Sequence, residues 1–281
     1  MNGGPLNVRL DAGQAAAAPA GESPAGALDT APPAGESRAG TLDTAGLTSA
    51  LGTAALREAL DRDGYAVTPP LIDGATCAEL ASLYDAGGET FRSTVIMARH
   101  GYGRGEYRYF ARPLPAAVAA LRREVYAALA PVANAWAARL ARPPHPRDPW
   151  PPGHDALVAR CAAAGQTRPT PLLLRYGPGD YNCLHQDLYG AIHFPLQAIL
   201  LLDRPGADFD GGELILVEQR PRRQSRPMVV PIAQGAFAIV PVKERPIETA
   251  RGAARVQMRH GVSVVRRGLR RTLGLIFHDA A

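Results

Sequence analysis

Two side chains able to bind a metal ion lie two positions apart in the segment Tyr181–Asp187. His185 and Asp187 form the one His-x-Asp sequence in the 281 residues of the chain. In an extended backbone, residues i and i+2 point to the same side, so this imidazole and this carboxylate can face one cation. A second imidazole from elsewhere would complete the two-histidine, one-carboxylate triad that suits Fe(II) and leaves coordination positions open. We take His260 as the candidate for that imidazole.

The segment Leu269–Phe277 adds a predicted anion-binding strand. Alternation places Arg270, Thr272, Gly274 and Ile276 on one face, and Leu269, Arg271, Leu273, Leu275 and Phe277 on the other. An arginine on the face with small residues can hold a carboxylate through two parallel hydrogen bonds, and a threonine hydroxyl can add a third. We therefore predict Arg270 and Thr272 as the carboxylate site, with Arg271 as the alternative if the register differs by one residue.

Other histidines have weaker claims to the metal. His193 lies eight residues after His185 and is a rival ligand, but Phe194 and Pro195 follow it, which favours a position at the start of a strand. His145 and His154 have no partner at metal-ligand spacing. We predict both on the surface.

Length and composition indicate one domain with additional segments. The chain is 46% hydrophobic, which is enough for a substantial core. It shows neither an apolar run long enough to span a bilayer nor a secretory signal, so we expect a cytoplasmic protein without a membrane partner. The three cysteines are far apart and form no CxxC pair, so we expect reduced thiols rather than a disulfide framework.

Charge is unevenly distributed along the chain. Residues 1–53 contain two arginines against five acidic residues, whereas residues 156–281 contain seventeen basic residues against ten acidic ones. A basic C-terminal half suits an anionic partner such as nucleic acid. The alternative is a compositional bias, because Lys243 is the only lysine and arginine is used heavily throughout.

Residues 1–53 are predicted to be a disordered, low-complexity tail. They are rich in Ala, Gly, Pro, Ser and Thr, and a unit containing Gly-Glu-Ser and Leu-Asp-Thr-Ala occurs twice, fourteen residues apart. Two copies with one leucine each cannot bury a core. We predict a single domain over 54–281, with helical support and a hairpin in 54–165 and the β core in 166–281.

Two basic segments are predicted to lie beside the substrate. Residues 91–110 are typical of a β-hairpin, and its tip mixes cations and aromatic rings, among them Arg104 and Tyr107. The loop at 220–226 contains Arg222 and Arg223. Such residues could hold phosphates and stack bases, although exposed arginines are more often simply solvated.

Helices are predicted over 54–63, 75–84, 116–140 and 154–164, where apolar residues recur at helical spacing. From residue 170 onward, short β segments alternate with Gly, Pro and Asp. Candidate strands cover 171–176, 194–202, 213–217, 228–231, 236–241, 254–259, 262–265 and 269–277. The predicted fold is mainly β with supporting helices (α+β), with a double-stranded β-helix, or jelly roll, as its core and the N-terminal helices packed on one sheet.

These motifs, in this order, resemble those of the Fe(II)/2-oxoglutarate-dependent dioxygenases. The segment Arg175–Tyr181, the run Asp210–Leu214 and His260–Ser263 are similar to the prolyl-4-hydroxylase-like branch. Within that branch, Gly165–Pro171, Cys183–Gly190 and Gln224–Pro227 resemble a bacterial family called Oxygenase-NA. The likeness to the superfamily covers about 170–279, and the likeness to the narrower family runs from about residue 60 to the end.

The resemblance implies an oxidoreductase with Fe(II) on His185, Asp187 and His260, and with 2-oxoglutarate and O2 as co-substrates. The expected reaction hydroxylates a C–H bond and releases succinate and CO2. Relatives often carry a tyrosine on the strand that here reads Ile199–Leu201, so Tyr176 or Gln197 would take that polar role. Oxidative demethylation of damaged nucleic acid is one expected function. The alternatives are a prolyl or other protein or small-molecule hydroxylase, and a non-enzymatic jelly-roll binding module.

Overall fold

The computed structural model describes residue 44 and residues 46–140, 149–250 and 252–281. These residues belong to one compact unit, which spans Gly40–Ala281. The predicted tail at 1–53 therefore lies mostly outside the described residues, as does His145. None of the described helices is long and apolar enough to cross a membrane.

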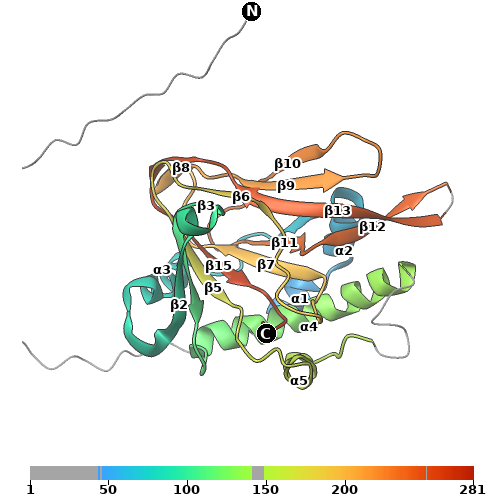
Figure 1. Ribbon diagram of the computed structural model, residues 1–281, viewed down its shortest axis with the longest axis horizontal. Helices are drawn as coiled ribbons and strands as arrows, with labels where there is room; N and C mark the ends of the chain where they lie inside the picture. The colour runs from blue at the N-terminus through green and yellow to red at the C-terminus, as the bar shows by residue number, and fades with distance from the viewer. Residues whose placement is uncertain (1–43, 45, 141–148, 251) are drawn as a thin grey trace, which may run out of the picture. The chain divides into compact units, whose positions relative to one another are not determined.

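Two antiparallel β-sheets face each other and form the predicted jelly roll (Figure 1). The seven-stranded sheet has the order β1-β11-β7-β15-β5-β4-β2, and the six-stranded sheet has the order β10-β9-β13-β6-β3 with β12 paired to β13. The strands of the first are β1 (Ala66–Val67), β2 (Phe91–Ile96), β4 (Glu106–Phe110), β5 (Leu172–Tyr176), β7 (Leu196–Leu201), β11 (Phe237–Pro241) and β15 (Arg270–Leu275). Those of the second are β3 (Gly103–Arg104), β6 (Tyr181–His185), β9 (Leu214–Gln219), β10 (Arg226–Val230), β12 (Glu244–Thr249) and β13 (Gly252–Val262). A small pair, β8 (Phe209–Gly211) and β14 (Val265–Gly268), closes one end.

The helices cover the outer face of the seven-stranded sheet. They are α1 (Leu47–Leu51), α2 (Ala54–Asp63), α3 (Gly74–Ser82), α4 (Ala116–Arg139) and α5 (His154–Ala163), with short 3₁₀ turns at Leu83–Asp85, Gly88–Thr90 and Met97–His100. Figure 1 shows the long α4 running beneath this sheet, opposite the six-stranded sheet. The main core lies here, because side chains such as Leu200 and Leu273 pack with Leu121 and Leu129 of α4. A second core of aliphatic residues, including Ile199 and Met258, fills the space between the sheets.

Local sequence explains where these elements begin and end. Asp73 caps α3 by accepting a hydrogen bond from the Thr76 amide, and Thr53 caps α2 in the same way. Ordered structure begins earlier than the predicted residue 54, because Leu47 and Leu51 are buried and α1 contacts α4. A helix of five residues is too short to show an apolar period in the sequence. Its stability comes from the tertiary contact with α4.

The predicted boundary at residue 165 does not separate support from sheet. Strands β2 and β4 of the predicted hairpin pair with each other, and β4 extends the seven-stranded sheet through β5. Within the same hairpin, β3 pairs instead with β6 of the other sheet. Gly105 lies between β3 and β4, which belong to different sheets. Its φ is 115°, and a Cβ there would lie 2.9 Å from the Tyr176 ring. Glycine is required at this crossing.

Candidate metal and dicarboxylate site

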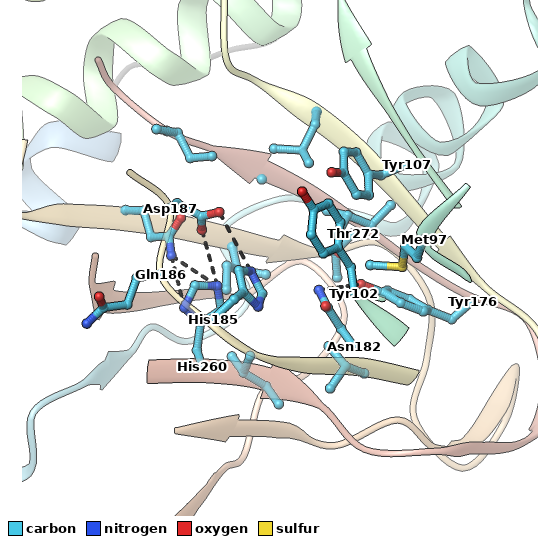
Figure 2. A pocket seen from close by; sticks show the side chains of 18 of the residues that line it. Met97, Tyr102, Tyr107, Tyr176, Asn182, His185, Gln186, Asp187, His260 and Thr272 are labelled. Atoms are coloured by element: carbon cyan, nitrogen blue, oxygen red, sulfur yellow. Dashed lines mark hydrogen bonds and ion pairs between the residues drawn. The ribbon is translucent and has the colours of Figure 1, made fainter. Parts of the chain in front are cut away.

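Three potential ligands converge between the sheets. His185 lies at the end of β6 and His260 lies directly opposite it in β13, so both imidazoles point to the same side. Asp187 follows two residues after β6. One ligand atom from each of the three residues lies within 4.8 Å of the others. Nε2 of His260 is 3.2 Å from Asp187 Oδ2, and Nε2 of His185 is 3.6 Å from Oδ1 (Figure 2). The group has the composition of a facial triad and could hold one metal ion.

Hydrogen bonds outside the triad orient two of its members. Nδ1 of His185 lies 2.8 Å from the Cys183 carbonyl oxygen, an acceptor, so Nδ1 carries the proton and Nε2 keeps its lone pair. The Tyr189 hydroxyl donates to Asp187 Oδ1 at 2.8 Å, and the Tyr109 hydroxyl donates to Tyr189 at 3.0 Å. Such outer contacts fix ligand orientation in metal sites.

The protonation states favour metal binding. Burial and the neighbouring His260 lower the pKa of His185, which keeps its imidazole neutral. Burial alone would raise the pKa of Asp187, but its hydrogen bonds to His260 and to the Tyr189 hydroxyl outweigh burial and hold the pKa below its usual range. A neutral imidazole and an ionised carboxylate are the forms that bind a cation.

The triad lines one wall of a cavity of about 450 Å³. The opposite wall is aromatic and apolar, as Figure 2 shows for Met97, Tyr102, Tyr107 and Tyr176. Arg270, Thr272, Gly274 and Ile276 also line this cavity, whereas Leu273 and Leu275 pack in the core under the helices. The predicted alternation of this strand is therefore confirmed, with Arg270 on the cavity face.

Arg270 is a buried cation with unused donors. Arg270 is 1% exposed, and its Nε and Nη1 atoms have no hydrogen-bond partner among the described residues. Arg271 points to the other face and pairs with Asp203 at 2.6 Å, so the alternative assignment to Arg271 is wrong. A buried guanidinium without an acceptor costs free energy unless a ligand supplies one. A dicarboxylate with one end at the triad and the other at Arg270 fits this requirement.

Tyr176 and Gln197 both line the cavity. They are the two residues predicted to take the polar role of the tyrosine that relatives carry on the strand here occupied by β7. Tyr176 is fully buried, its hydroxyl accepts a hydrogen bond from Asn182 Nδ2 at 3.2 Å, and its ring centre lies 5.7 Å from the Arg270 guanidinium carbon. Gln197 places its amide nitrogen 3.2 Å from Nε2 of His260. Tyr176 is therefore beside the carboxylate end and Gln197 beside the metal end.

The four predicted substrate-side residues fall in different places. Tyr107 lines the cavity, whereas Arg104 is exposed on β3 and does not line it. Arg222 and Arg223 line a separate hollow. His193 does not belong to the triad and lies near His278, with ring centres 6.5 Å apart. His154, predicted on the surface, is buried because α5 packs it against Tyr126 and Phe277.

Tyr189 and Tyr109 were not predicted as parts of the site. Tyr189 is two residues after Asp187, and the same period of two that joins His185 to Asp187 could have identified it. Tyr109 comes from β4, which is distant in the sequence, and only the pairing of β4 with β5 brings it close.

Known proteins similar to this chain include oxygenases. The family model of Oxygenase-NA, described as an oxygenase catalysing oxidative methylation of damaged DNA, matches residues 105–280. An uncharacterized protein of Mycobacterium tuberculosis H37Rv, Rv2227, is 46% identical over 172 residues, which cover 61% of this chain and 72% of the relative.

Two solved structures also resemble the chain. A prolyl-4-hydroxylase of Pseudomonas putida has a TM-score of 0.49 at 14% identity, with 82% of this chain and 100% of that chain covered. A 2OG-Fe(II) oxygenase family oxidoreductase of Burkholderia pseudomallei has a TM-score of 0.49 at 16% identity, with 81% and 92% covered.

Proposed function

Because the chain belongs to the Oxygenase-NA family, we propose that it is an iron- and 2-oxoglutarate-dependent oxygenase that oxidises methyl groups on damaged nucleic-acid bases. The family expected from the sequence is confirmed, and with it an enzyme rather than a binding module. The expected cytoplasmic location stays a prediction.

One observation carries the co-substrate assignment. The triad and the guanidinium of Arg270 line the same cavity, and Thr272 lines it as well, on the same face of β15 as Arg270. His185, Asp187 and His260 would hold Fe(II), and Arg270 with Thr272 would hold the distal carboxylate of 2-oxoglutarate. With the metal and 2-oxoglutarate bound, O2 would supply the oxidising power: one oxygen atom would enter succinate as 2-oxoglutarate loses CO2, and the other would enter the substrate.

The protein's own residues bind and orient the reacting groups and shield the cavity from water. Tyr189 holds Asp187, and the Cys183 carbonyl holds the His185 tautomer. The aromatic wall formed by Tyr102, Tyr107 and Tyr176 lies opposite the triad, where its rings can shield bound groups from water and offer flat surfaces to a base. Hydroxylation of an N-methyl carbon replaces a C–H bond by C–OH. The N–C bond then breaks, formaldehyde leaves and the nitrogen keeps a proton.

The test measures products. Purified protein with Fe(II), ascorbate and 2-oxoglutarate should form succinate, and methylated oligonucleotides should release formaldehyde in equal amounts. The same oligonucleotides without methyl groups are the control. Succinate formation coupled instead to a gain of one oxygen in proline-containing peptides would replace the nucleic-acid substrate with a protein one.

A further inference from the structure

A second hollow, which we call the arginine hollow, lies at the turn between β9 and β10. Its volume is about 880 Å³, and its lining comes from the turn and from β13: Gln219, Arg220, Pro221, Arg222, Arg223, Gln224, Arg255 and Gln257. Four of these eight residues are arginines and none is acidic. The hollow is open to solvent, and Arg222 and Arg223 are exposed.

Neighbouring carboxylates do not neutralise this charge. Glu218 is buried and meets three guanidiniums, at 2.7 Å from Arg220, 2.5 Å from Arg245 and 3.9 Å from Arg226. Burial would raise the pKa of Glu218, but its hydrogen bonds to Arg220 and Arg245 lower it, so the carboxylate stays ionised and is shared by several cations.

The remaining cations keep the hollow positive. Arg255 lies 3.5 Å from Glu244, and in the described part of the chain no carboxylate is within ion-pair distance of Arg222 or Arg223. The hollow therefore carries a positive excess that can attract an anion.

Gln186 and Gln257 connect the arginine hollow to the metal site. Gln186 directly follows His185 and lines the cavity. Its Nε2 donates to Oε1 of Gln257 at 3.3 Å, and Gln257 lines the arginine hollow. Along β13, Gln257 is three residues from His260, which corresponds to about 10 Å in a strand, and this odd spacing places their side chains on opposite faces of the sheet. The two recesses therefore lie close together but on opposite sides of β13.

The opposite side of the metal site is aromatic. Tyr102 is half exposed at the tip of the β2–β4 hairpin, and His100 stacks on it with ring centres 5.3 Å apart. In Figure 2, Gln186 extends from the triad away from Tyr102 and Tyr107. Cations on one side and aromatic rings on the other are the two components that bind a single strand of nucleic acid.

We infer that the arginine hollow binds backbone phosphates of the strand whose methylated base enters the metal cavity, with Arg222 and Arg223 as the principal contacts. This inference rests on the proposed function and adds the path of the nucleic-acid strand along the protein surface. Phosphate contacts fix the register of the strand, and the cavity selects the base.

The experiment measures binding of a fluorescent, methylated single-stranded oligonucleotide across a range of salt concentrations. The double variant Arg222→Ala/Arg223→Ala should bind roughly tenfold more weakly at low salt. The slope of log K against log salt should fall by about 1.4, since each lost phosphate contact contributes about 0.7 for single strands. Arg222→Lys/Arg223→Lys keeps the charge and should keep the slope, which also controls for folding.

A matched variant removes the same charge elsewhere. Arg123→Ala/Arg204→Ala takes two exposed arginines from α4 and from the turn after β7, neither of which lines the hollow or the cavity, and should bind as the wild type does. An unchanged slope in the Arg222/Arg223 alanine variant, with a wild type that binds and demethylates the oligonucleotide, overturns this inference alone. A wild type that neither binds nor demethylates the oligonucleotide overturns the nucleic-acid substrate as well.

Discussion

Asp187 is the triad residue with the most contacts to neighbouring polar groups. Its Oδ2 faces His260 and its Oδ1 accepts from the Tyr189 hydroxyl, which in turn accepts from Tyr109. With Oδ1 occupied, Oδ2 is the oxygen presented to a metal. A carboxylate held in this way coordinates through one oxygen and leaves the remaining positions for co-substrates.

Removing the Tyr189 hydroxyl should therefore weaken metal binding. Tyr189→Phe keeps the ring and loses the bond to Asp187, and outer-shell losses of this kind cost roughly 10- to 100-fold in metal affinity. Titration with Co(II), followed by its visible absorption, measures the dissociation constant without turnover. Tyr126→Phe, which removes a buried hydroxyl that donates to the Pro151 carbonyl outside the cavity, is the control. Equal Co(II) affinity in the wild type and Tyr189→Phe would contradict the role of Tyr189.

Arg270 should determine binding of 2-oxoglutarate but not of the metal. Arg270→Leu removes the buried donors that have no partner in the part of the chain that the structure describes. The affinity for 2-oxoglutarate should fall by at least tenfold, because hydrogen bonds to charged groups contribute roughly 1.5–3 kcal/mol. Calorimetry of the Mn(II)-loaded protein measures this, and Co(II) titration should be unchanged. Arg271→Leu, on the opposite face, should retain 2-oxoglutarate affinity, and a similar loss in both variants would count against the assignment.

At the scale of elements, the turn between β8 and β9 positions Arg270. Gly212 has a φ of 61°, and a Cβ at this position would lie 2.7 Å from Cδ of Arg270 and 2.8 Å from Cγ2 of Val265. The guanidinium can occupy its place only because this residue lacks a side chain. The turn is thus part of the carboxylate site although it contributes no polar group to it.

Gly212→Ala should therefore raise the Michaelis constant for 2-oxoglutarate and lower the free energy of unfolding by roughly 1–2 kcal/mol. Gly206→Ala is the matched control, since Gly206 has a φ of 78° with no atom within 4 Å of an added Cβ. It bears the same backbone cost without displacing Arg270. If both variants raise the Michaelis constant equally, the effect comes from the backbone and not from Arg270.

Sequence reasoning succeeded where a local period was sufficient. The alternation in β15 predicts the cavity face of Arg270 without reference to strand pairing, and the His-x-Asp spacing predicts that two ligands lie together. It failed for strands whose formation depends on tertiary pairing. β12 contains Pro246 and acidic residues, β6 begins after a Gly-Pro-Gly turn, and neither has the apolar alternation of a strand. Their pairing with β13 stabilises them instead.

At the scale of the molecule, buried histidines make stability depend on pH. His154 donates from Nε2 to the Phe277 carbonyl, and burial, helped by the nearby Arg122, lowers its pKa to about 4. In the unfolded chain its pKa is near 6.5. Between these values only the unfolded state binds the proton. The free energy of unfolding should therefore fall as the pH drops from 6.5 to 4, and His154 should contribute nothing to this dependence above pH 6.5.

His154→Gln should flatten this dependence. Glutamine can still donate to the carbonyl but does not titrate, so the loss of stability between pH 7 and pH 5 should shrink by about 2 kcal/mol. Urea unfolding at the two pH values measures it. His100→Gln changes an exposed histidine and should leave the dependence as in the wild type. An identical pH dependence in His154→Gln and the wild type would mean that other groups cause the acid sensitivity.

The hairpin that belongs to both sheets has a consequence for ligand traffic. Gly105 joins β3, which pairs with β6 of one sheet, to β4, which pairs with β5 of the other. The two sheets are therefore connected through the chain at this end. Splaying the sheets apart would break the β3–β6 ladder. Entry and exit must instead depend on rotation of the partly exposed rim side chains Tyr102 and Leu188, a motion of picoseconds to nanoseconds, while the amides beneath them stay protected from exchange.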